Sequence, residues 1–144
     1  MVTAVHAPAL RPSLLLPVTL LAALASCSDA HDVAFRVTLA GDVPVPPGVF
    51  IAFVIAEGTP VEGATAKSQV PVTQGVRTYQ GKSSICCKPA PTVELFAFID
   101  LDGDRQLDFD EPRGADPKNP VTLADGSTAY SSAIVITLAP TATP

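Results

Sequence analysis

The feature that most limits the fold of this chain is the way in which proline and glycine cut it into short segments. The 144 residues include 15 prolines and 9 glycines, most of which fall between short apolar runs. Proline fixes φ and removes a backbone donor, so it is excluded from the interior of helices and central strands. No segment after residue 32 has the apolar period of an amphipathic helix. The chain is therefore predicted to be all-β.

Two kinds of strand are predicted. Residues 33–39, VAFRVTL, alternate as a strand covered on one face does, whereas residues 49–56, VFIAFVIA, are apolar on both faces as in a central strand. Further strands are expected at 92–100 and 132–138, with weaker ones at 68–73, 75–81 and 119–126; Pro71 indicates an edge position, and Gln74 and Gly75 a turn. About seven short strands predict one antiparallel β-sandwich domain over residues 33–144.

The N-terminal segment is predicted to be an export signal. Residues 14–25, LLLPVTLLAALA, are mostly apolar but fall short of the ~20 residues that a membrane-spanning helix needs. The sequence LASC at 24–27 resembles the lipobox of bacterial lipoprotein signal peptides, in which cleavage precedes a lipid-modified cysteine. This resemblance implies a signal peptide at 1–26, a lipid anchor on Cys27 and a tail at 27–32.

The resemblance also implies a location in the bacterial cell envelope, with the membrane as a partner. Ser28 follows the cysteine, and the absence of Asp there implies the outer membrane, facing the periplasm or the cell surface. ALA at 23–25 is an alternative site for ordinary secretory cleavage, which would release a secreted protein. A buried core helix is the third interpretation. Both export interpretations place the cysteines in an oxidising compartment.

Negative charge is concentrated in one short segment. Residues 1–26 contain one of the 9 basic side chains and none of the 14 acidic ones, whereas residues 100–111 contain six carboxylates and Arg105. An acidic excess confined in this way indicates a local cation site rather than a solubilising surface. The chain has no basic patch for nucleic acid.

The spacing of these acids resembles that of the EF-hand calcium loop. Such a loop offers side-chain oxygens at alternate positions, then a carbonyl and a bidentate Glu. Carried over to this chain, the resemblance implies that Asp100, Asp102 and Asp104 bind the ion directly. Gln106, at position 7, would supply its backbone oxygen, Asp108 would bind through a water molecule, and Glu111 would close the site. The cofactor implied is Ca²⁺.

Two features separate this segment from an EF-hand. Arg105 stands where the EF-hand loop has a glycine with positive φ, and the segment follows a strand and leads into Pro112 and Gly114 rather than joining helices. The segment instead resembles the strand-borne DxDGDxxxD loop of exported bacterial β-sandwich proteins of the transthyretin-like (prealbumin-like) kind. The fold expected is therefore a sandwich of transthyretin-like or immunoglobulin-like type. The alternative for the loop is a solvated acidic turn, and Mg²⁺ fits less well because it prefers few carboxylates and several waters.

Cys86 and Cys87 are adjacent in the sequence. Neighbouring Cα atoms are ~3.8 Å apart, below the usual disulfide range, so a bond between them would be strained. Three interpretations remain: a strained vicinal disulfide with a structural role, a soft-metal thiolate pair, or one buried and one free cysteine. If Cys27 carries no lipid, one of the pair could bond to it.

Catalysis is the weaker hypothesis. The only histidine after residue 26 is His31, expected in the solvated tail, and no phosphate-binding loop opens a helix. Paired carboxylates in one local loop do not face each other across a cleft as those of a glycosidase do. We therefore expect no enzyme, but a non-catalytic envelope lipoprotein whose calcium-stabilised domain contacts an unknown protein or envelope partner. The alternative is a redox or soft-metal-handling protein that uses Cys86 and Cys87.

Overall fold

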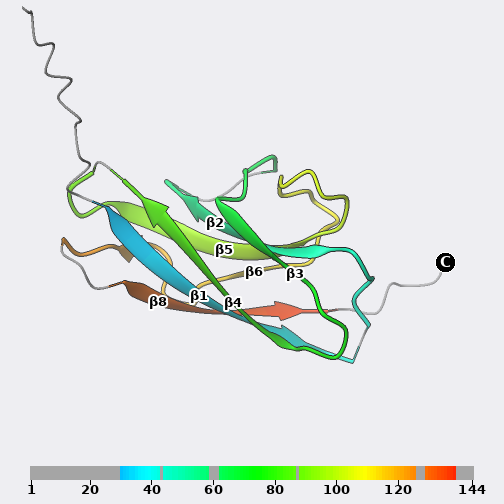
Figure 1. Ribbon diagram of the computed structural model, residues 1–144. Helices are drawn as coiled ribbons and strands as arrows, with labels where there is room; N and C mark the ends of the chain where they lie inside the picture. The colour runs from blue at the N-terminus through cyan, green and yellow to red at the C-terminus, as the bar shows by residue number, and fades with distance from the viewer. Residues whose placement is uncertain (1–29, 43, 59–61, 87, 126–128, 139–144) are drawn as a thin grey trace, which may run out of the picture.

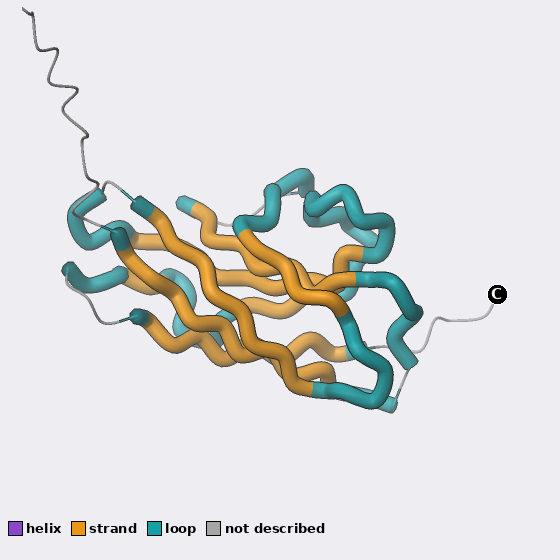
Figure 2. Tube along the Cα trace, in the orientation of Figure 1, coloured by secondary structure: helices purple, strands orange, loops and turns teal. Residues whose placement is uncertain are grey.

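The computed structural model describes residues 30–138 except for 43, 59–61, 87 and 126–128. The described part consists of strands and loops (Figure 2). The strands are β1 (His31–Ala40), β2 (Phe50–Ala56), β3 (Ser68–Pro71), β4 (Thr78–Ile85), β5 (Thr92–Asp100), β6 (Arg113–Ala115), β7 (Val121–Thr122) and β8 (Tyr130–Thr137). No helix long and apolar enough to cross a bilayer occurs among these residues.

The strands form two sheets packed face to face, which confirms the predicted β-sandwich (Figure 1). One sheet has the order β4-β1-β8 and the other the order β3-β2-β5-β6, with β7 also paired to β5. All pairs are antiparallel except β1 with β8, which is parallel. No hairpin joins these two strands, so turn geometry does not set their relative direction.

The main core lies between the sheets and follows from the alternation of the long strands. In β1, Val33, Phe35, Val37 and Leu39 are buried, as the sequence pattern predicts. The ring of Phe35 packs on that of Phe53 from β2, with 5.0 Å between the ring centroids. Burial of such side chains, at roughly 25 cal/mol per Å² of apolar surface, is the main force that holds the two sheets together.

A second, smaller apolar cluster covers the outer face of the larger sheet. It consists of Ala52, Val54, Phe98, Ala66 and Leu107. The first three belong to β2 and β5, whereas the last two belong to loops that fold over the sheet. This arrangement explains why β2 and β5 are apolar on both faces, and it fixes the loop after β5 to the sandwich.

Some element boundaries differ from the prediction. The strand expected at 75–81 is Thr78–Ile85, because residues of β4 as far as Ile85 pair with β1 although few of them are apolar. The short strand β6 was not predicted at all; it forms by pairing with β5. The turn at Gln74 and Gly75 is confirmed by a hydrogen bond from Val76 N to Thr73 O, and β3 is an edge strand as Pro71 indicated.

The predicted tail was too long at its C-terminal end. β1 begins at His31, two residues before the expected boundary at Val33, and His31 is buried rather than solvated. The reason is non-local: segments near Lys88 and Ala124 fold over the start of β1 and contact the histidine ring. The predicted signal peptide at 1–26 and the lipid-modified Cys27 lie outside the described residues.

Candidate metal centre

The acidic loop, residues 100–111, begins with a carboxylate that is fully buried. Asp100 is the last residue of β5 and is 0% exposed. Its Oδ1 accepts a hydrogen bond from Gly103 N at 2.7 Å, and its Oδ2 accepts one from Arg105 N at 3.2 Å. The loop is therefore wound around this carboxylate by its own backbone amides.

Two further aspartates face the same point. Asp102 accepts a hydrogen bond from Asp104 N at 3.0 Å, and Asp104 accepts one from Gln106 N at 2.6 Å. One carboxylate oxygen from each of Asp100, Asp102 and Asp104 lies within 4.8 Å of the others. Three such oxygens can be shared by a single hard cation, which would offset their mutual repulsion.

The backbone of Gln106 lies in the orientation that a carbonyl ligand requires. Thr65 and Gln106 form an isolated antiparallel bridge, whose hydrogen bonds run from Ala66 N to Arg105 O and from Leu107 N to Ala64 O. The N–H and C=O of Gln106 therefore point away from the neighbouring segment, in the geometry of a non-hydrogen-bonded pair. Its N–H donates to Asp104, and in an extended segment the C=O of a residue points to the same side as its N–H.

Glu111 holds the two ends of the loop together. It is 5% exposed; its Oε1 accepts a hydrogen bond from Leu101 N at 2.8 Å, and its Oε2 accepts one from Asp108 N at 3.1 Å. Asp108 and Glu111 are not part of the group of oxygens within 4.8 Å. The structure thus gathers three of the five predicted carboxylate ligands and does not bring the other two into that group. Each Glu111 oxygen keeps a second lone pair for a cation.

The electrostatics of the loop disfavour full ionisation without a cation. The pKa of Glu111 is raised, chiefly by burial and then by the charges of Asp100 and Asp108, against the lowering effect of its two amide hydrogen bonds. The pKa of Asp108 is also raised, first by loss of hydration and then by the surrounding aspartates at 104, 102, 110 and 100. A divalent ion in the loop would reverse the effect of these charges on both groups.

Arg105 adopts the conformation that the EF-hand comparison requires of a glycine. Its φ is +67°, in the left-handed region, and Gly103 two residues earlier has φ +83°. A side chain in this region costs roughly 1 kcal/mol. The loop therefore makes this turn in spite of the arginine, and Arg105 carries the strain of the left-handed region.

The loop is anchored by its one buried apolar side chain, that of Leu107, which is 1% exposed within the outer cluster. Its amide and carbonyl pair with Ala64 O and Gly63 N at 3.0 and 2.8 Å. Sequence reasoning missed this second segment, residues 63–67, because nothing in its local pattern indicates that it covers the acidic loop (Figure 1). Leu107 itself, the only aliphatic side chain between the first three acids and the last three, was the available signal.

Of the adjacent cysteines, only Cys86 belongs to the residues that the structure describes. Cys86, directly after β4, is disulfide-bonded, and so offers no thiolate to a soft metal in this state. Cys87 and Cys27 lie outside the described residues, and the identity of the bonded partner stays a prediction.

Comparison with known proteins adds no further constraint: no family model, curated protein or solved structure matches this chain.

Proposed function

We propose that this protein is a non-catalytic lipoprotein of the bacterial cell envelope, whose β-sandwich is an interaction module with Ca²⁺ bound in the acidic loop. The observation that carries the metal proposal is the convergence of Asp100, Asp102 and Asp104, with one oxygen of each within 4.8 Å of the others. Acids are common in turns, but a buried first carboxylate wrapped by loop amides is not expected of a solvated turn.

The proposed ligand set follows the spacing of the loop. The first three aspartates bind directly, Gln106 supplies its carbonyl oxygen, Asp108 binds through water and Glu111 closes the site with both oxygens. The backbone orientation of Gln106 and the position of Glu111 over Leu101 N and Asp108 N support this set. Seven oxygens at ~2.3–2.6 Å suit Ca²⁺, whereas Mg²⁺ would retain several waters.

The proposed role of the ion is to stiffen a contact surface. Phe109, between Asp108 and Asp110, is 71% exposed at the acidic loop, and aromatic side chains are enriched in protein interfaces. A cation that binds only the folded loop stabilises the fold by mass action and limits the motion of this segment. The partner proposed is a protein or envelope component, with the membrane reached through the lipid on Cys27.

The metal proposal is tested by thermal unfolding of the purified protein in excess EDTA and then in about 10 mM CaCl₂. For a dissociation constant of ~10⁻⁴ to 10⁻³ M, calcium should stabilise the protein by roughly 1.5 to 2.7 kcal/mol, or about 5 to 15 °C in Tm. Asp102→Ala should lose this shift. Asp110→Ala is the matched control, because Asp110 lies in the same loop outside the ligand set, and it should keep the shift.

Two outcomes would overturn the metal proposal. No shift in the wild type would make the loop an ordinary solvated turn. An equal shift in Asp102→Ala would mean that calcium acts elsewhere or only screens charge. MgCl₂ at the same ionic strength should give a smaller shift than CaCl₂.

The anchor is tested separately by Cys27→Ser in the producing bacterium. We expect the wild type in the membrane fraction with incorporated radiolabelled fatty acid, and the variant without label. Equal amounts of soluble, unlabelled protein from both would instead favour secretory cleavage after Ala25.

A further inference from the structure

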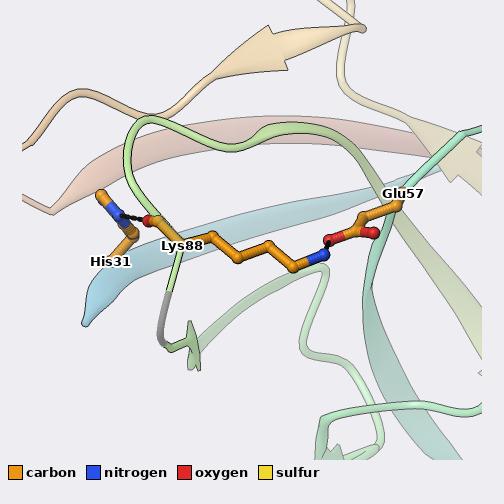
Figure 3. Close-up of polar contacts among 3 residues, drawn as sticks. All are labelled: His31, Glu57 and Lys88. Atoms are coloured by element: carbon orange, nitrogen blue, oxygen red, sulfur yellow. Dashed lines mark hydrogen bonds and ion pairs between the residues drawn. The ribbon is translucent and has the colours of Figure 1, made fainter. Parts of the chain in front are cut away.

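The ring of His31 lies between two backbone carbonyl groups. The residue is 4% exposed at the start of β1. Its Nε2 lies 2.8 Å from Lys88 O, a contact drawn as a dashed line in Figure 3, and its Nδ1 lies 3.1 Å from Ala124 O. Both distances are those of hydrogen bonds, and both partners can only accept.

The number of hydrogen bonds here depends on the protonation state of the ring. A neutral imidazole has one N–H donor and one acceptor nitrogen, so it can satisfy only one of two carbonyl groups. An imidazolium donates from both nitrogens and satisfies both. In the neutral form one nitrogen lone pair faces a carbonyl oxygen in a buried place, which costs the hydrogen bond and leaves two acceptors opposed.

The two carbonyl groups belong to segments that come together only at this end of the sandwich. One is residues 88–91, which follow β4, and the other is residues 123–125, which follow β7. They are joined to each other by hydrogen bonds from Leu123 N to Pro91 O at 2.9 Å and from Ala90 N to Asp125 Oδ1 at 2.8 Å. His31 is thus the link from both segments to β1.

Among the residues that the structure describes, few charged groups belong to the segments around the ring. The segment 88–91 contributes Lys88, whose ammonium pairs with Glu57 after β2 (Figure 3). The segment 123–125 contributes Asp125, which accepts from Ala90. On β1, Asp32 is exposed and points to the opposite face of the strand, and the β4 residue paired with His31 is Ile85. The ammonium of Lys88 is thus paired with the carboxylate of Glu57, and the carboxylate of Asp125 lies in the other segment that contacts the ring.

We propose that His31 is a protonation-controlled latch between β1 and the segments 88–91 and 123–125. Proton uptake from solvent places N–H groups on both nitrogens and ties both segments to the strand. Loss of that proton removes one of the two hydrogen bonds, and the longer contact, to Ala124, is the one released. The protonated ring therefore ties both segments to β1 and stabilises this end of the fold, and loss of the proton on raising the pH removes that contribution. An envelope protein exposed to external pH would respond to acidification by tightening here.

The latch is tested by NMR on the full chain labelled with ¹⁵N-histidine, over about pH 5 to 8.5. The His31 resonances, distinguished from those of His6 by a His31→Gln sample, should show two protonated ring nitrogens at low pH and one at high pH. Over the same range the hydrogen-exchange protection factors of the Ala90 and Leu123 amides should fall roughly two- to tenfold, the equivalent of one hydrogen bond. His31→Gln cannot titrate, so its protection factors should not change with pH.

A ring that stays in one neutral tautomer throughout, or that titrates while the wild-type protection factors stay constant, would overturn the proposal. The wild-type measurements decide the matter even if His31→Gln folds poorly. Repeating them in EDTA and in calcium separates this result from the metal proposal, because the latch lies at the opposite end of β5 from the acidic loop and should behave the same in both.

Discussion

The two faces of the larger sheet are buried in different ways. The inner face packs on a second sheet, so its core depends on strands alone, as with Phe53 against Phe35. The outer face packs on two loops, and one of its buried side chains, Leu107, belongs to the acidic loop. A metal in the loop should therefore matter to the outer cluster and leave the inner core largely unaffected. Substitutions on each face can test that separation.

The largest effect is expected from Phe53→Ala on the inner face. Phe53 is fully buried, and truncation of such a side chain costs roughly 3–5 kcal/mol through lost burial and a cavity. We expect the same loss of unfolding free energy with calcium and with EDTA, measured by urea denaturation. A loss that depended strongly on calcium would show that the two faces are energetically coupled.

Leu107→Ala tests the outer face. We expect a loss of about 2–3 kcal/mol in calcium, toward the lower end for a buried leucine because the cluster is small. Since Leu107 anchors the loop, the variant should also bind calcium more weakly, so the calcium-dependent rise in Tm should shrink. An undiminished rise would mean that the ligands are held without this anchor. Titration calorimetry would measure the affinity directly.

The pH dependence of the calcium effect is expected to be smaller. Folding raises the pKa values of Asp108 and Glu111, so in EDTA their contribution to stability is full below the unfolded pKa values and is lost as pH rises through the folded ones. Calcium favours the ionised forms and removes this loss. The calcium-dependent rise in Tm should therefore be greatest near neutral pH and decline on acidification toward those pKa values. A rise that is constant across this range would exclude a contribution from these two groups.

The smallest effect is expected from Arg105→Gly. Glycine removes the strain at φ +67° but adds freedom to the unfolded chain, so the net stabilisation should be about 1 kcal/mol or less. Calcium affinity should rise slightly, because the turn would form at a lower cost. Arg105→Ala keeps a β-carbon and serves as the control; an equal gain there would trace the effect to charge rather than to the backbone.

Local patterns predicted the strong strands and the first part of the site. The alternation in β1 and the apolar run in β5 report burial directly, and the aspartates at 100, 102 and 104 converge because a short loop brings alternate residues together. The limits of β4 could not be predicted, because Gly81 faces inward there and gives no apolar signal. It leaves room for the ring of Phe53 from the other sheet: a β-carbon at Gly81 would lie 2.2 Å from Phe53 Cε2. Information of this kind is held by residues far apart in the sequence.

The same limit applies to β6 and to His31. In β6, Gly114 lies so close to β8 that an added β-carbon would be 2.2 Å from the Val135 carbonyl oxygen. The local sequence around Gly114 does not indicate that contact. His31 looks like a tail residue because its partners, Lys88 and Ala124, lie 57 and 93 residues away. The ligand roles of Asp108 and Glu111 depend on the loop geometry in the presence of an ion, which spacing alone does not determine.

The parallel pairing of β1 with β8 has a consequence for the order of assembly. Val33 pairs with Tyr130 and Ala40 with Thr137, so the first strand lies beside the last. A chain that emerges N-terminus first can pair β1 with β4 early, but it leaves the other edge of β1 open until residues 130–137 have been delivered. Closing so long a loop is slow, and an open strand edge invites association with other chains. Residues 130–137 thus complete the sheet, and a chain truncated before them would keep an unpaired strand edge that can associate with other chains.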